Sequence, residues 1–210
     1  MAEQDKNAGT GINIVDAPVT LTVYLRNCPD LSVTDLPGAV MNPMGNQPHD
    51  IRDQTEKLIK SYCMSNEETI MLCVTKANDD LANSHGLLLT NIIDPTGNRT
   101  MGVLTKSDLA KPQIVRTFIE DNNEVNFRYG FTAVINKSKE DQAKGISIEQ
   151  RITLARTYFD DTPEYSGCDK KFLGTENLRS NLSNILLEKM KNAFGPIQGD
   201  LMIHLLEIEQ

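Results

Sequence analysis

The sequence has neither an excess of basic residues nor a long apolar run. Its 210 residues include 21 Lys and Arg against 29 Asp and Glu, which gives a net charge of -8. A general binder of the phosphate backbone needs a basic face, so we expect no nucleic-acid partner. No stretch approaches the roughly 18 apolar residues of a membrane span. The first seven residues are polar, without the apolar core of a signal peptide, and we expect a cytoplasmic protein.

The sequence also lacks the spacings of a metal site or of a disulfide framework. None of its four cysteines forms a C-x-x-C pair, and its three histidines are far apart along the chain. Scattered cysteines of this kind are typical of reduced, mostly buried thiols in a cytosolic protein. The residues in question are Cys28, Cys63, Cys73, Cys168, His49, His85 and His204.

Strand-like and helix-like segments alternate along the middle of the chain. The near-continuous apolar run 69–74 predicts a strand buried on both faces. The other predicted strands are 19–25, 31–35, 100–104 and 130–135, the first two forming an antiparallel hairpin around a turn at 27–30. The predicted helices are 50–63, 81–93, 112–121, 147–160 and one that starts near Thr175 and breaks at Gly195-Pro196. This order predicts an α/β fold with three layers, in which a mostly parallel sheet has helices on both faces.

Polar residues follow three of these strands at the point where each one ends. They are Asp35-Leu36-Pro37-Gly38, Thr105-Lys106-Ser107-Asp108 and Asn136-Lys137-Ser138. Each alone is typical of an ordinary turn or loop. Together they would open onto one edge of the sheet, where open α/β sheets bind their ligands.

These three loops carry the groups that a guanine nucleotide needs. Guanine offers a ring N–H and an exocyclic amine, and the carboxylate of Asp108 can accept from both, whereas adenine offers no such pair. The methylene stem of Lys106 can lie against the base, and Asn136-Lys137 can cover its other face. Asp35 can hold Mg²⁺ through water, and Gly38 can offer its backbone N–H to the terminal phosphate. The sequence therefore predicts a site for GTP or GDP with Mg²⁺ as the cofactor.

Four stretches of the chain resemble the GTPase domain of the dynamin superfamily, as found in dynamins and myxovirus-resistance proteins. They are VTDLPGAVMNPMGNQPHDI, TKANDDLANSHGL, DPTGNRTMGVLTKSDLA and AVINKSKED. The resemblance implies a P-loop NTPase-like fold in which Asp35 to Gly38 form the switch II box, with Asp35 and Gly38 catalytic. It also implies that GTP is bound by Asp35, Leu36, Pro37, Gly38, Thr105, Lys106, Ser107, Asp108, Asn136, Lys137 and Ser138.

The same resemblance implies a division of the chain and a set of partners. Residues 1–195 would belong to the GTPase domain and residues 196–210 to the start of a helical neck, with Pro196 at the hinge. Asp80 matches an acidic position that reaches the partner's nucleotide site in a dimer of GTPase domains. The implied partners are GTP or GDP and a second copy of the protein, and by family analogy membranes, at which it would be peripheral, or microtubules.

The sequence departs from this family in one large respect. It contains no G-x-x-x-x-G-K-[S/T], and none of its glycines is followed by lysine. The P-loop holds the phosphates and the metal ion, and phosphoryl transfer depends on that positioning. We therefore expect this chain by itself to bind nucleotide weakly and to be inactive.

Two hypotheses remain open at this point. The chain is a piece of a dynamin-like GTPase, truncated before the switch II box, whose intact form hydrolyses GTP to drive self-assembly and membrane remodelling. Alternatively, it is a degenerate, non-catalytic dynamin-like interaction module that acts through its terminal helices and its sheet edge. A guanine-nucleotide sensor with a remodelled phosphate site is a third, weaker alternative.

Overall fold

The computed structural model of the chain describes residues 14–24, 26, 31–39, 43, 47–80, 84–120 and 125–208. Its strands are β1 (Met71–Lys76), β2 (Thr100–Thr105) and β3 (Phe131–Ala133). Its helices are α2 (Ile51–Met64), α3 (His85–Ile93), α4 (Pro112–Glu120), α5 (Lys139–Ala143), α6 (Ile148–Asp161) and α7 (Thr175–Ile208). Single 3-10 turns lie at Ser107–Leu109, Pro163–Tyr165 and Lys170–Phe172.

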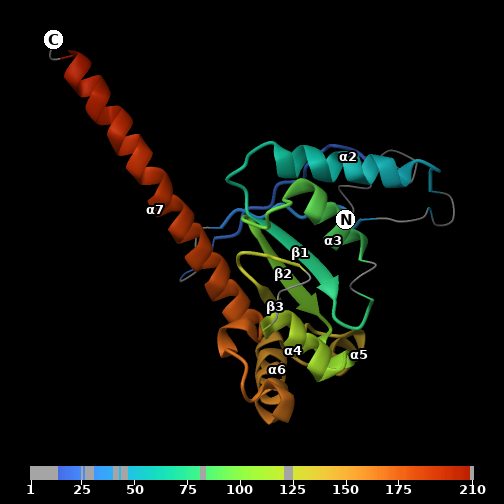
Figure 1. Cartoon of the computed structure of the whole chain (residues 1–210). Helices are drawn as coiled ribbons and strands as arrows, with labels where there is room; N and C mark the ends of the chain where they lie inside the picture. Colours follow the sequence, from blue (N-terminus) through green and yellow to red (C-terminus); the bar gives the residue numbers. More distant parts are fainter. Residues whose placement is uncertain are drawn as a thin grey trace.

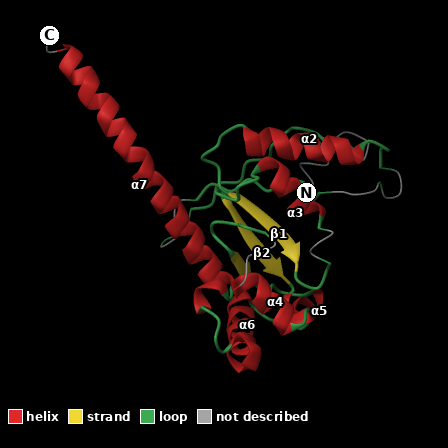
Figure 2. Cartoon of the chain, in the orientation of Figure 1, coloured by secondary structure: helices red, strands yellow, loops and turns green. Residues whose placement is uncertain are grey.

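The three strands form one parallel sheet in the order β1-β2-β3, with helices on both sides (Figure 1, Figure 2). Met71 pairs with Thr100 at the start of β1, and Lys76 pairs with Thr105 at its end. Helix α3 packs on β1 and α2 packs on α3, whereas α4 packs on β3. The predicted α/β class is confirmed. Because the strands are parallel, their carboxyl ends meet at one edge of the sheet.

Strand β2 is the centre of the hydrophobic core, and its first five residues are buried. Gly102 allows the close approach of β3, since a Cβ at this position would lie 2.1 Å from the ring of Phe131. The Phe131 ring stacks on Phe127 with centroids 5.2 Å apart and meets Phe118 edge-on at 5.5 Å. This packing buries β2 on both faces, as expected for an apolar run in a parallel sheet.

Strand β1 is buried on one face only. Cys73 lies in the core with Leu87 of α3, whereas the side chains of Leu72 and Val74 are 40% and 57% exposed. The prediction that this strand is buried on both faces is therefore wrong. Helix α3 covers one face, and the described elements leave the alternate residues of the other face largely open.

The predicted hairpin of strands 19–25 and 31–35 is also absent from the described residues. Residues 14–24 and 31–39 have no regular structure, and Leu21 and Tyr24 are 83% and 91% exposed. An isolated two-stranded hairpin is marginal in water, so an alternating pattern forms a strand only where a sheet accepts it. One side-chain tie holds this coil, a hydrogen bond of 2.9 Å that Tyr62 Oη of α2 donates to Asp16 Oδ1.

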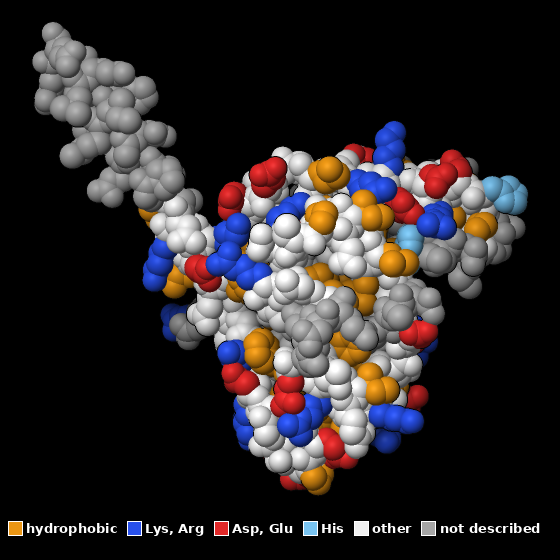
Figure 3. Space-filling model, viewed as in Figure 1, with side chains coloured by type: hydrophobic (Ala, Val, Ile, Leu, Met, Phe, Trp, Pro, Cys, Tyr) orange, Lys and Arg blue, Asp and Glu red, His pale blue; other side chains and the backbone are white. Residues whose placement is uncertain are grey.

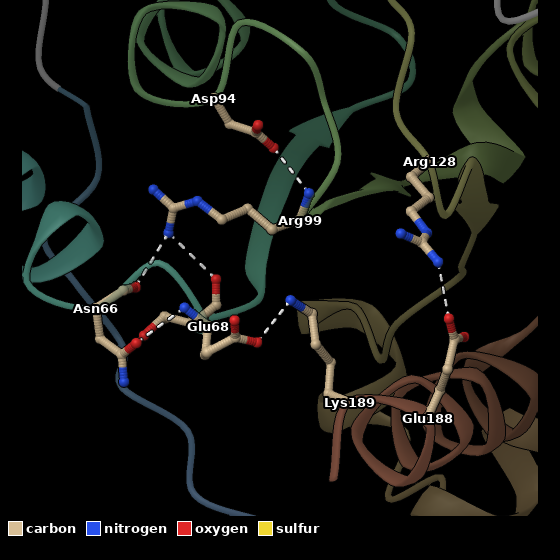
Figure 4. Close-up of polar contacts among 8 residues, drawn as sticks. Asn66, Glu68, Asp94, Arg99, Arg128, Glu188 and Lys189 are labelled. Atoms are coloured by element: carbon tan, nitrogen blue, oxygen red, sulfur yellow. Dashed lines mark hydrogen bonds and ion pairs between the residues drawn. The ribbon is translucent and has the colours of Figure 1, made fainter. Parts of the chain in front are cut away.

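Helix α7 runs without a break through Gly195-Pro196, so the predicted interruption there is wrong. Proline lacks an N–H but has a φ compatible with a helix, and the helix continues with one backbone hydrogen bond fewer. Two ion pairs hold the middle of α7 to the body of the molecule. Glu188 Oε1 lies 2.8 Å from Arg128 Nη2, and Lys189 Nζ lies 2.9 Å from Glu68 Oε2 (Figure 4). Beyond them the helix projects away from the sheet (Figure 1).

Several smaller expectations also have an outcome. Cys63, Cys73 and Cys168 are free thiols, the last two buried. Cys28, the turn at 27–30, residues 81–83 and Asp121 lie outside the described residues. Among the helices that the structure describes, none is long and apolar enough to cross a membrane.

Candidate functional site at the carboxyl edge of the sheet

Strand β2 ends in a turn that presents Lys106 and Asp108 at the sheet edge. Lys106 has φ 55° and ψ 39°, and it is the single non-glycine residue with positive φ among those described. The left-handed region disfavours a residue with a Cβ by about 1–2 kcal/mol. The buried Ser107 then donates its hydroxyl to the Leu104 carbonyl over 2.9 Å, which fixes the turn. Unfavourable backbone conformations of this kind gather at functional sites.

Strand β3 delivers the second predicted loop to the same place. Val134 N donates to the Leu104 carbonyl over 2.8 Å, and Ser107 N donates to the Val134 carbonyl over 3.4 Å. Asn136, Lys137 and Ser138 follow and are exposed. Two of the three predicted loops, 105–108 and 136–138, are thus brought together by backbone hydrogen bonds.

Ser138 has a structural role in this loop. Its hydroxyl accepts from the Asp141 amide over 3.1 Å, and its own amide donates to Asp141 Oδ2 over 3.0 Å. This reciprocal pair is a capping box that starts α5. The side chain of Ser138 is therefore occupied, while the exposed side chains of Asn136 and Lys137 remain available at the edge.

The end of β1 lies at this edge as well. Ala77 N donates to the Thr105 carbonyl over 2.8 Å, and Thr105 Oγ1 donates to the Thr75 carbonyl over 3.0 Å. The exposed loop that follows contains Asp80, the residue matched to the trans-dimer position. Asp80 is therefore exposed beside the strand end that borders the loop 105–108.

The carboxylate of Asp108 faces helix α6. Arg151 Nη2 lies 3.2 Å from Asp108 Oδ2, and the two side chains are 17% and 31% exposed. Burial raises the pKa of Tyr158 on the same helix, and the negative charge of Asp108 raises it further. The Asp108 carboxylate is thus held in a partly enclosed position by Arg151, which suits an acceptor of hydrogen bonds from a bound base.

The structure does not join the DLPG segment to these loops. Asp35, Leu36, Pro37 and Gly38 lie in the irregular stretch 31–39, with Asp35 and Gly38 exposed. Asp35 makes no hydrogen bond or ion pair with a described residue, and a Cβ at Gly38 would meet open space. The described structure therefore builds the base side of the predicted site and leaves the phosphate side unassembled.

The donor set fits a magnesium ion only when a nucleotide carries it. In the part of the chain that the structure describes, no three His, Cys, Asp or Glu residues gather to hold a metal. Mg²⁺ keeps several waters and takes one or two carboxylates together with phosphate oxygens. The exposed carboxylate of Asp35 fits one such water-mediated contact, and nucleotide phosphates would supply the other ligands.

Positive and negative side chains are interspersed on the visible face of the molecule. Figure 3 shows Lys and Arg alternating with Asp and Glu, without a continuous basic stripe on that face. A nucleic-acid interface needs such a stripe to neutralise a row of phosphates. The charges seen from this side suit local, paired contacts instead.

The sequence reasoning missed Arg151 and the short helix α5. Arg151 lies 43 residues after its partner Asp108, and no spacing rule links the two. Helix α5, in contrast, had a local signal in Ser138-x-x-Asp141, because the spacing of a capping box can be recognised in sequence.

Comparisons with known proteins agree on one family. The model of the Dynamin family matches residues 1–107, and the model of the Dynamin central region matches residues 117–210. Human Dynamin-2 is 33% identical over 209 residues, which cover all of this chain and 24% of that protein. The fission yeast (Schizosaccharomyces pombe) Vacuolar protein sorting-associated protein 1 is 34% identical over 196 residues, 93% of this chain and 29% of its own length. The Dynamin-related protein dnm1 of the same yeast is 34% identical over 203 residues, which cover 97% of this chain and 26% of that protein.

The chain spans about a quarter of the length of these relatives. The gap between the two matched regions, 108–116, starts shortly after β2 and ends inside α4. Both regions contribute strands to the same sheet, since β2 and β3 are paired.

Proposed function

The chain belongs to the dynamin family, and from this premise we propose that it carries the guanine-recognition edge of a GTPase domain. One observation carries the proposal. The loops 105–108 and 136–138 meet at the carboxyl edge of a parallel sheet, joined from Ser107 N to the Val134 carbonyl. Ligands of open α/β sheets bind at this edge.

In this proposal each side chain at the edge has a chemical role. The Asp108 carboxylate accepts from the ring N–H and the exocyclic amine of guanine. The stem of Lys106 lies against one face of the base, and Asn136 with Lys137 covers the other. Thr105, Ser107 and Ser138 hold these loops in shape through the hydrogen bonds of the strand ends and the α5 cap.

The phosphate side of the proposed site is less complete. Asp35, through water, and the backbone N–H of Gly38 would meet a Mg²⁺-bound phosphate end, with Leu36 and Pro37 shaping the turn. The 210 residues supply no G-x-x-x-x-G-K-[S/T] to hold the β- and γ-phosphates. Hydrolysis of GTP to GDP and phosphate is therefore proposed for the intact protein of which this chain is a piece. An in-frame P-loop sequence upstream of the Met1 codon would support this, whereas stop codons throughout would contradict it.

The proposal for the whole protein extends to assembly and membranes. Residues 1–195 belong to the GTPase domain and 196–210 to the start of the neck. Asp80 contacts the partner's nucleotide site when two GTPase domains meet. The protein self-associates, acts in the cytoplasm or at membrane surfaces, and remodels those membranes. A relative named for vacuolar protein sorting supports the membrane role, and microtubules stand only as a family analogy.

A second candidate is a non-catalytic interaction module. Two exposed apolar surfaces favour it, one formed by Leu72 and Val74 on β1 and the other by Leu187, Met190 and Phe194 on α7. A module of this kind would bind partner helices or strands and have no preference for guanine. The nucleotide measurement described next separates the two candidates.

The proposed function is tested by titrating the ¹⁵N-labelled chain with GDP and, separately, with ADP. Hydrogen bonds to a charged group contribute about 1.5–3 kcal/mol, so GDP should bind at least about tenfold more tightly than ADP. Amide shifts should concentrate at Lys106–Asp108 and Asn136–Ser138. Equal responses to the two nucleotides, or shifts elsewhere, would contradict the proposal and favour the interaction module.

Asp108→Asn tests the central contact. The substitution replaces one acceptor oxygen by an amide donor, so the preference for GDP over ADP should fall about tenfold or more. Binding of XDP should gain, because xanthine carries a carbonyl in place of the exocyclic amine. Asp79→Asn is the matched control at the neighbouring strand end, where Asp79 pairs with Lys76 at 3.2 Å. Unchanged selectivity in Asp108→Asn would contradict the role given to Asp108.

A further inference from the structure

Arg151 is held in a defined place at the start of α6. The preceding Ser147 accepts from the Gln150 amide over 3.2 Å, and its own amide donates to Gln150 Oε1 over 2.8 Å. This capping box fixes the first turn of the helix. The Arg151 side chain is consequently directed back over the sheet edge and is only 17% exposed.

The guanidinium group of Arg151 lies between two carboxylates from different loops. Its Nη2 is 3.2 Å from Asp108 Oδ2, after β2, and its Nε is 3.4 Å from Asp141 Oδ2, after β3. Asp141 Oδ2 also accepts from the Ser138 amide over 3.0 Å. That amide hydrogen bond and the charge of Arg151 hold the pKa of Asp141 below its usual range. One side chain therefore ties Asp108 to the cap of the Asn136–Ser138 loop.

We propose that Arg151 is a positioning residue for guanine recognition, which fixes the rotamer of Asp108 and the spacing between the two base-binding loops. This rests on the proposed function of the edge. Asp108 stands in a 3-10 turn of three residues, directly after the left-handed Lys106. The hydrogen-bonded turn fixes the backbone of Asp108, and the rotamer of its carboxylate depends on side-chain contacts. Arg151 engages Oδ2 and leaves Oδ1, with the second lone pair of Oδ2, for the two donors of the base.

The effect of this contact is to reduce the cost of ordering Asp108 when a base binds. Immobilising one side chain at an interface costs about 0.5–1.5 kcal/mol. Removing the guanidinium should therefore weaken the preference for GDP over ADP by roughly two- to tenfold. It should leave contacts made through the phosphates unchanged, because the ion pairs that Arg151 makes with described residues are those with Asp108 and Asp141.

The experiment compares Arg151→Met, Arg151→Lys and a control, Arg156→Met, in the full 210-residue chain. Arg156 lies on the same helix but pairs with Glu176 of α7 and not with Asp108 or Asp141, and its side chain is 66% exposed. Two quantities are measured. The three-bond Hα–Hβ couplings of Asp108 report its rotamers without any nucleotide, and titrations with GDP and ADP report base selectivity.

We expect a single Asp108 rotamer in the unmodified chain and in Arg156→Met, averaged couplings in Arg151→Met, and partial recovery in Arg151→Lys. Selectivity should follow the same order. A single Asp108 rotamer in Arg151→Met would overturn the inference, whatever the measured selectivity between GDP and ADP. Averaged couplings in Arg151→Met with an unchanged preference for GDP over ADP would overturn the claim that this contact supports guanine recognition. If the unmodified chain shows no preference for GDP over ADP, the proposed function is overturned. The couplings of Asp108 would still test whether Arg151 fixes its rotamer.

Discussion

Replacing Lys106 with glycine separates the needs of folding from those of base recognition. Lys106 has φ 55°, a backbone conformation that glycine adopts freely and lysine does not. Its side chain makes no hydrogen bond or ion pair with a described residue, so glycine loses no such contact. We expect Lys106→Gly to stabilise the fold and to weaken nucleotide binding.

The magnitude follows from two opposing effects. Relief of the left-handed conformation contributes about 1–2 kcal/mol. The larger conformational freedom of glycine in the unfolded chain removes about 0.5–1 kcal/mol of that gain. The net increase in the free energy of unfolding is about 0–1.5 kcal/mol, with a midpoint near 0.75 kcal/mol, which for a chain of this size corresponds to a rise in Tm of about 2–3 °C at that midpoint.

Urea unfolding followed by circular dichroism measures the stability, and titration with GDP measures binding. Lys137→Gly is the matched control, since Lys137 is also exposed at this edge but its φ is not positive. The control should lose about 0.5–1 kcal/mol of unfolding free energy, because it gains only the entropy penalty. A loss of stability in Lys106→Gly equal to that of the control would refute the strain argument. Stabilisation with unchanged GDP binding would refute the role of the lysine stem.

Two further predictions concern the core and the phosphate chemistry. Burial alone would raise the pKa of Asp94, but hydrogen bonds from Thr100 Oγ1 at 2.7 Å and from the Arg99 amide at 3.0 Å (Figure 4) lower it. The stabilisation by the ionised Asp94 carboxylate is therefore present above the unfolded pKa of about 3.9 and is lost as pH falls through the lower folded pKa. The difference in unfolding free energy between the unmodified chain and Asp94→Asn should consequently shrink from pH 7 to pH 3. A difference that does not depend on pH would contradict this. The 210-residue chain should release no phosphate from GTP above the buffer rate, and robust Mg²⁺-dependent hydrolysis would contradict the need for a P-loop.

The middle of the fold could be predicted because local pattern and tertiary burial agree there. The apolar run 100–104 forms β2, and the helices predicted at 112–121 and 147–160 are α4 and α6 with bounds shifted by one residue. Helix α3 starts at His85, because Ser84 caps it by accepting from the Leu87 amide. These elements lie in or against the core, so periodicity reports their environment correctly.

The amino-terminal region could not be predicted from its pattern. Residues 19–25 and 31–35 alternate like strands, yet those of them that the structure describes are irregular and largely exposed. Alternation specifies which face of a strand is apolar, but a strand also needs a neighbour with unpaired backbone groups. Strand β1 does have a neighbour in β2, but the described elements leave one of its faces largely uncovered, so Leu72 and Val74 stay exposed although the run 69–74 is apolar.

The proximity of the predicted loops 105–108 and 136–138 was predictable, and the side-chain contacts between them were less so. The ends of β2 and β3 lie together because parallel strands end at one edge, and that follows from the predicted topology alone. Arg151 could not be anticipated in the same way, because its contact with Asp108 depends on how α6 packs, not on a local spacing. Long-range ion pairs of this kind become visible only with the tertiary structure.

The described contacts that hold the edge formed by loops 105–108 and 136–138 join residues that follow residue 70. Its backbone hydrogen bonds run from Ala77 N to the Thr105 carbonyl and from Val134 N to the Leu104 carbonyl, both at 2.8 Å. Arg151 adds its tie from α6. Because the partners in these contacts all follow residue 70, we expect a rearrangement of residues 14–39 to leave the contacts in place. We therefore expect the base selectivity proposed for this edge to be separable from phosphate chemistry, so that GDP is preferred over ADP even where no GTP is hydrolysed.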